Sequence, residues 1–248
     1  MILETVVYTM DGAYQAQKGG ADRIELRANP AEGGTTPSYG AIELVRQHMN
    51  LDVVVMVRPR GGDFVYSIEE YHIMKKDIEI CKRLSVDGVA FAMLNVDGTI
   101  DKSRCKKLID LARPLKVTCN RAFDMTADAF QAMEDCIEVG FDRIITSGQQ
   151  QGAKDGVELI KNLTTRAGRR ISIIVGGPIT EDEISHIVSL SGVNELQISA
   201  CAFQQAKMKF SNPRINLTMG IQNDFKNHTI DPAYVKRIRS LVQGVSRI

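Results

Sequence analysis

The 248-residue sequence lacks several features that mark particular classes of protein. It has no tryptophan, and no apolar run approaches the roughly 20 residues that a membrane-spanning helix needs. Its first residues, MILETVVYTMDG, show no basic region followed by a long apolar stretch, so we expect no secretory signal. These absences predict a cytoplasmic protein without a membrane partner.

An excess of charge is also missing, with 31 Lys and Arg against 30 Asp and Glu. A dedicated nucleic-acid-binding protein usually carries a surplus of basic residues, so this balance argues against a nucleic-acid partner. The five cysteines are scattered, odd in number and without a CxxC motif, which favours reduced thiols over a disulfide framework or a structural zinc site. With 44% apolar and 25% charged residues, the composition is that of an ordinary globular protein.

Eight short apolar runs alternate with longer amphipathic stretches along most of the chain. Continuous apolar runs of this length are typical of parallel strands that are covered by helices. The predicted strands are residues 2–8, 23–26, 53–57, 88–91, 116–119, 143–146, 171–175 and 196–198.

Helix-start signals lie between these strands. Ser67 and Thr180 each stand three residues before a glutamate, which is the spacing of a capping box. Eight βα units in about 250 residues fit a closed (β/α)8 barrel, and the GxGxxG motif of a Rossmann-type sheet is missing after the first strand. We therefore predict one α/β domain over residues 1–248, a TIM-like barrel with a long loop at 201–230 and a last helix at about 231–243. Loops of that length are usually functional, interfacial or mobile.

Polar residues collect where the predicted strands end, at the rim that carries the chemistry of such barrels. Two arginines on a loop with Pro and Gly form fork-shaped donors that match carboxylate or phosphate. The ends of strands seven and eight are where many barrels hold a phosphate on backbone N–H groups. The residues predicted to bind a small anionic ligand are Arg58, Arg60, Asp63, Asn120, Arg121, Ser147, Gly176, Gly177 and Ser199.

Acid–base chemistry at this rim would fall to Glu4, Glu25 or Asp124, because carboxylates in different environments can serve as acid and base. Glu4 and Glu25 could equally be structural, since buried charges need ionic partners. None of the four histidines, at 48, 72, 186 and 228, falls at a predicted strand end, so we expect them at the surface and infer no Ser-His-Asp set. The cysteine positions predict no metal site.

Five segments resemble the copper homeostasis protein CutC family, and the resemblance runs from Leu3 to about Ala200. It implies a cytosolic TIM-like barrel with a role in copper homeostasis, and copper is the only cofactor it implies. Glu4, Glu25, Arg58, Arg60, Asp63, Arg121, Asp124, Ser147, Gly176 and Gly177 match the family's rim pattern. The segments are KGGADRIEL (18–26), EGGTTPSYG (32–40), VRPRGGDFVYS (57–67), NRAFDM (120–125) and GFDRIITSGQ (140–149).

The chain departs from the family pattern at positions that bear on copper. Val6 and Arg27 stand where many members have the cysteines proposed to hold Cu(I), a metal that prefers thiolates, and Asn120 replaces a common histidine. Two functions stay open: copper binding or trafficking, and a metal-independent enzyme acting on a small phosphorylated or carboxylated metabolite. A non-catalytic scaffold is a third reading, and we expect a homo-oligomer of an order that the sequence does not give.

Overall fold

The computed structural model describes residues 1–210, 212, 214–215 and 226–245. Eight parallel strands follow one another around a closed barrel, and β8 pairs with β1 to complete it. The predicted barrel is confirmed, and each predicted strand matches an observed one within one residue at either end. The strands are β1 (Ile2–Val7), β2 (Arg23–Leu26), β3 (Asp52–Met56), β4 (Gly88–Ala90), β5 (Lys116–Cys119), β6 (Arg143–Thr146), β7 (Ser172–Val175) and β8 (Glu195–Ile198).

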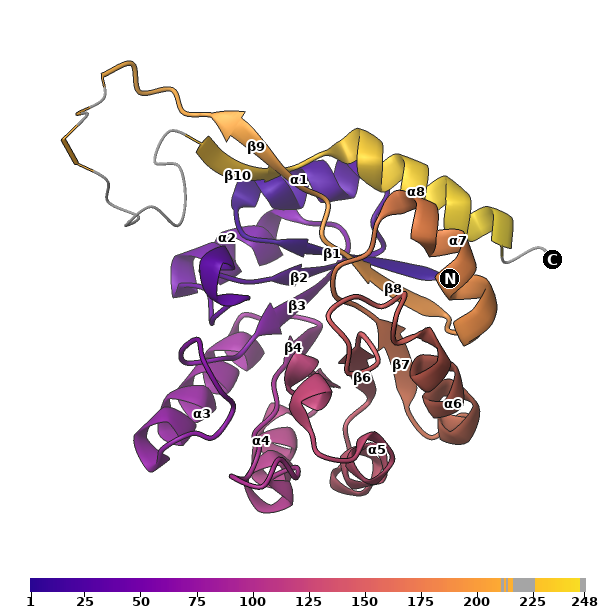
Figure 1. Ribbon diagram of the computed structural model, residues 1–248. Helices are drawn as coiled ribbons and strands as arrows, with labels where there is room; N and C mark the ends of the chain where they lie inside the picture. The colour runs from indigo at the N-terminus through magenta and orange to yellow at the C-terminus, as the bar shows by residue number, and fades with distance from the viewer. Residues whose placement is uncertain (211, 213, 216–225, 246–248) are drawn as a thin grey trace.

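The helices form a ring around the strands (Figure 1). The capping boxes predicted at Ser67 and Thr180 are present and begin two of the helices. No helix in the described ranges is both long enough and apolar enough to cross a membrane. The ring contains α1 (Met10–Gly19), α2 (Tyr39–His48), α3 (Ile68–Arg83), α4 (Lys102–Ala112), α5 (Ala129–Val139), α6 (Val157–Ala167), α7 (Glu181–Ser191) and α8 (Pro232–Val245), with short 3-10 turns η1 (Pro30–Glu32) and η2 (Arg121–Met125) in the loops.

Alternation along the strands separates two buried layers. Leu3, Ile24 and Cys119 belong to the hydrophobic layer between the strands and the helices. Asn120, the next residue after Cys119, is buried on the other side, where its side chain contacts Met56. The barrel interior also contains buried charged and polar groups, so its core carries electrostatic interactions as well as packing.

The segment after β8 differs from the predicted loop. Its two ends, β9 (Cys201–Gln205) and β10 (Lys226–Ile230), pair as an antiparallel hairpin that projects from the ring beside α1 (Figure 1). The strands are polar and mostly exposed, so no apolar alternation signals them in the sequence. Residues 211, 213 and 216–225 of the predicted loop lie outside the described residues.

Candidate functional site

Glu4 lies inside the barrel as part of a buried ion pair. Its carboxylate accepts a hydrogen bond from Arg23, which also donates to Glu195. Burial opposes ionisation of Glu4, but the positive charges of Arg23 and Arg143 outweigh it and hold the pKa of Glu4 below its usual value. Glu4 is therefore an ionised structural carboxylate, and it lines neither of the cavities described below.

Glu25 lies one layer closer to the open end and is fully buried. Its two carboxylate oxygens accept hydrogen bonds from Arg27 at 3.1 and 3.0 Å. The Gln197 amide donates to both Glu25 and Glu4, so it joins the two carboxylates. Glu25 thus neutralises Arg27 and fixes the position of its guanidinium, which also donates to the Gly33 carbonyl at 3.2 Å.

Arg121 enters the same end from the loop after β5. Its Nε donates to Asp124 at 2.8 Å and its Nη2 to Ser147 Oγ at 2.7 Å, while Nη1 has no partner among the described residues. Asp124 also accepts from the Thr146 hydroxyl and from the Ser147 backbone N–H at 3.1 Å. Since its oxygens are engaged by several donors, Asp124 positions Arg121 and is poorly placed to transfer a proton.

Arg58 carries a buried positive charge that no carboxylate in the described chain neutralises. Its guanidinium donates to the carbonyls of Glu32, Gly34 and Gly62 at 2.7, 3.0 and 2.6 Å. Its side chain has a further N–H, on Nε, which is buried and has no partner. A buried cation with an unused donor is costly unless a ligand completes it.

Two cavities at the C-terminal ends of the strands share Arg27 and Arg121, and we call them together the mouth. The first has a volume of about 310 Å³, and the second of about 340 Å³. The first is lined by Arg27, Glu32, Gly33, Met56, Arg58, Phe64, Asn120, Arg121, Asp124 and Met125. The second is lined by Val6, Tyr8, Arg27, Arg121, Gly177, Pro178, Gln197, Ile198 and Ser199.

Several predicted site residues gather at the mouth. Arg58, Asn120, Arg121 and Asp124 line its first cavity, and Gly177 and Ser199 line its second. Ser147 lies directly against Arg121. Gly177 has φ +104°, and a Cβ there would lie 3.4 Å from Arg121 Cζ, so glycine lets the chain pass close to the guanidinium.

Other predicted residues lie elsewhere. Arg60 pairs with Asp63 at 3.0 Å and with Glu70 at 2.5 Å, and neither Arg60 nor Asp63 lines the mouth. Gly176 packs inside the barrel, where a Cβ would meet Ile145 at 2.6 Å. Glu4 and Glu25 do not line the cavities. They are buried in the barrel as the ionic partners of Arg23 and Arg27.

The lining residues that were not predicted from the sequence include Tyr8, Arg27 and Glu32. Tyr8 closes the predicted first strand and Arg27 directly follows the second, so their rim positions were accessible to the same reasoning. Glu32 lies on η1, away from any strand end, and no sequence signal pointed to it. Burial raises the pKa of Tyr8 against the opposing charge of Arg27, so its phenol is neutral near pH 7.

Metal-binding groups do not cluster in the described residues, where no three His, Cys, Asp or Glu side chains could hold one ion. Cys81, Cys105 and Cys136 are buried in helices, and burial raises the pKa of Cys81 to about 12. Cys201 is exposed, with its Sγ 3.3 Å from His228 Nδ1. The expectation of a surface histidine is wrong for His228, which is half-buried in β10.

The fold and the mouth define a class: closed (β/α)8 barrels with an arginine-lined cavity at the C-terminal rim. The chain belongs to the CutC family, whose sequence pattern matches residues 1–202. The resemblance noted in the sequence is thereby confirmed.

Individual relatives agree with this assignment. The copper homeostasis protein cutC homolog of Homo sapiens is 41% identical over 97% of this chain and 87% of its own length. A CutC family protein of Parabacteroides distasonis is 43% identical over 95% of this chain and 98% of its own. The crystal structure of CutC from Streptococcus agalactiae superposes with a TM-score of 0.76 at 31% identity, covering 79% of this chain and 97% of that one.

Proposed function

We propose that the mouth binds a small phosphorylated or carboxylated metabolite and that the chain is an enzyme acting on it. The observation that carries this proposal is the convergence of Arg27, Arg58 and Arg121, from three different loops, on one cavity of about 310 Å³. Arg121 Nη1 has no hydrogen-bond partner among the described residues, and Arg58, which lines the same cavity, has a buried Nε without a partner. Guanidinium donors with unfilled hydrogen bonds match the oxygens of a phosphate or carboxylate.

Backbone donors at the second cavity support the same ligand. The N–H groups of Gly177 and Ser199 donate to no residue in the described part of the chain, and both residues line the cavity beside Arg121. Free backbone N–H groups at the ends of β7 and β8 are a recurrent phosphate-binding arrangement in such barrels.

Proton transfer at this site falls to groups other than those first predicted. Among the carboxylates of the mouth, the side chain of Glu32 has no hydrogen-bond or ionic partner within the described residues, so it can act as a base. Tyr8 lines the other cavity as a neutral phenol and can donate one. Glu25 and Asp124 act as positioning residues, because each holds one of the arginines.

Calorimetric titration with phosphorylated and carboxylated metabolites, after a thermal-shift screen, tests the proposal. Arg121→Ala should weaken binding of any hit about 10- to 100-fold, since hydrogen bonds to charged groups contribute about 1.5–3 kcal/mol. Arg60→Ala is the matched control, an arginine of the rim loops outside the mouth. Binding that survives Arg121→Ala, or that falls equally in both variants, would contradict the proposed site.

Copper homeostasis is the second candidate function, because the human relative is named for it. The specific observation in its favour is the thiol–imidazole pair of Cys201 and His228, since Cu(I) prefers soft ligands such as thiolate. Competition for Cu(I) with a chromogenic chelator should show weaker binding by Cys201→Ala than by Cys81→Ala, which removes a buried thiol. Equal affinity in the two variants would exclude this pair as the copper site.

A further inference from the structure

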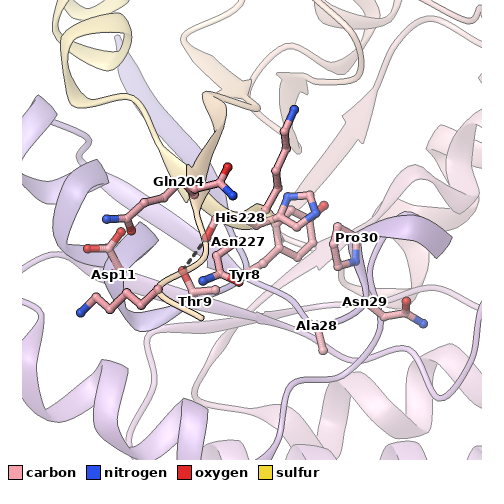
Figure 2. A pocket seen from close by; sticks show the side chains of 12 residues that line it. Tyr8, Thr9, Asp11, Ala28, Asn29, Pro30, Gln204, Asn227 and His228 are labelled. Carbon is pink, nitrogen blue, oxygen red and sulfur yellow. Dashed lines mark hydrogen bonds between the residues drawn. The ribbon is translucent and has the colours of Figure 1, made fainter. Parts of the chain in front are cut away.

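A third cavity adjoins the mouth, and its volume of about 740 Å³ is more than twice that of either mouth cavity. The barrel rim forms one wall and the β9–β10 hairpin forms the other. Figure 2 shows Tyr8 and His228 together at its centre, with Asp11 and Gln204 toward one side and Asn29 toward the other. Tyr8 also lines the second mouth cavity, so the two spaces meet at this side chain.

The hairpin wall is attached to the rim by specific contacts. Thr9 Oγ1 donates to the His228 carbonyl at 3.4 Å, and Thr229 Oγ1 donates to Asp11. Below the hairpin, the backbone N–H of Asp231 donates to the carbonyl of Ala200 at 3.0 Å. Hydrogen bonds between the barrel rim and the β9–β10 hairpin therefore fix the two walls of the cavity relative to each other.

The lining contains three charged residues, Asp11, Lys207 and Lys226, and a larger set of uncharged polar side chains that suit hydroxyl groups. Asn29, Gln204, Gln205 and Asn227 supply amides, each of which can both donate and accept hydrogen bonds. The aromatic rings of the site lie together, with the ring centroid of His228 at 6.0 Å from Tyr8. Uncharged amides beside a ring suit the hydroxyls and the C–H face of a sugar.

His228 adds to this site a ring nitrogen without a hydrogen-bond partner. Its ring also packs against Phe203, at 4.8 Å between centroids, and its Nδ1 faces the Cys201 thiol. Its Nε2 is buried and has no hydrogen-bond partner in the described structure. A buried ring nitrogen without a partner is the kind of group that a ligand hydroxyl completes.

We infer that the ligand of the mouth is a sugar phosphate or sugar acid, whose hydroxylated part extends past Tyr8 into the hairpin cavity. This inference rests on the proposed function, which places the anionic group at the arginines. Six of the twelve lining residues lie beyond residue 202, where the family match ends. The hairpin thus adds a ligand preference that the family pattern does not encode.

Titration of the full chain with three probes tests this inference: inorganic phosphate, ribose and ribose 5-phosphate. Ribose 5-phosphate should bind at least tenfold more tightly than phosphate. The double substitution of Gln204→Ala with Asn227→Ala should remove that gain and leave phosphate binding unchanged. Lys209→Ala, on an exposed residue of the same segment that does not line the cavity, should keep the gain.

The two possible failures can be told apart. A gain below tenfold, or a gain that survives the double substitution, would overturn the sugar site while phosphate binding at Arg121 still stood. An absence of binding by phosphate, by ribose 5-phosphate and by every carboxylated metabolite of the screen would overturn the proposed function together with this inference. Melting temperatures within a few degrees of the unsubstituted chain show that the variants are folded.

Discussion

At the scale of single residues, Arg58 and Arg60 show how two arginines separated by one residue in the sequence acquire different roles. Arg58 is 7% exposed and binds three loop carbonyls, so its charge stays at the mouth without a carboxylate partner. Arg60 is directed to Glu70 at the start of α3 and lies over the ring of Tyr66. The first is available to an anion, while the second serves the loop and the capping box.

Glu4→Gln tests the buried ion pair beneath the mouth. The substitution keeps the side-chain size but leaves Arg23 with a single carboxylate, Glu195, in the barrel interior. Removing one partner of a buried ion pair costs about 3–5 kcal/mol, so the free energy of unfolding in urea should fall by about that amount. Glu43→Gln, at a partly exposed carboxylate on α2 that forms no ion pair with a described residue, should change it by less than about 0.5 kcal/mol. Equal losses of unfolding free energy in the two variants would show that the buried ion pair of Glu4 does not stabilise the fold.

The same pair predicts a dependence of stability on pH. Since the pKa of Glu4 is lowered on folding, its contribution is complete above the unfolded value of about 4.3 and disappears as the pH falls through the folded value. The difference in unfolding free energy between the unsubstituted chain and Glu4→Gln should therefore narrow below about pH 4. A difference that stays constant from pH 7 to pH 3 would contradict the ionised state assigned to Glu4.

At the scale of elements, the ends of the strands decide what the mouth contains. Gly177, at the end of β7, lets the backbone pass beside Arg121 and Ser147. On the opposite side of the barrel end, Arg27 follows β2 and is fixed by Glu25 of the same strand. These strand ends bring together two arginines that lie 94 positions apart in the sequence.

Comparing Gly177→Ala with Gly168→Ala separates the effect of backbone strain from the effect of a side chain placed against Arg121. Both Gly177 and Gly168 have positive φ, +104° and +57°, but a Cβ at 177 meets Ser147 Cβ at 3.0 Å, while at 168 it meets nothing within 4 Å. Alanine at either position should lower the unfolding free energy by about 1 kcal/mol or more. Only Gly177→Ala should also weaken anion binding, as measured by titration. Equal binding in the two variants would remove Gly177 from the site.

The elements show which features could be predicted from the sequence. The eight barrel strands were predictable because most are short apolar runs bounded by turn signals, and α3 and α7 because of their capping boxes. The β9–β10 hairpin was not, since its strands are mostly polar and mostly exposed. The directions of Arg58 and Arg60 were also inaccessible, because both lie beyond β3, where strand alternation no longer fixes the side chains. The Glu25–Arg27 pair, two residues apart on one face of a strand, could have been predicted from that alternation.

At the scale of the whole molecule, closure of the barrel is what turns scattered polar residues into one site. The hydrogen bonds between β8 and β1 bring the two ends of the described barrel together, so residues from the loops after β1, β2, β5, β7 and β8 surround one opening. Helix α8 completes the ring between α7 and α1 (Figure 1). The hairpin that precedes α8 extends this opening by a third cavity.

Anomalous diffraction from crystals soaked in selenate tests the central claim most directly, because selenate has the shape and charge of phosphate and its selenium can be located. We predict a selenium peak in the cavity bounded by Arg27, Arg58 and Arg121, with an oxygen within hydrogen-bond distance of Arg121 Nη1. The peak should be lost in Arg121→Ala crystals. Selenium peaks found only on the outer surface, with this cavity empty of the anion, would contradict the account.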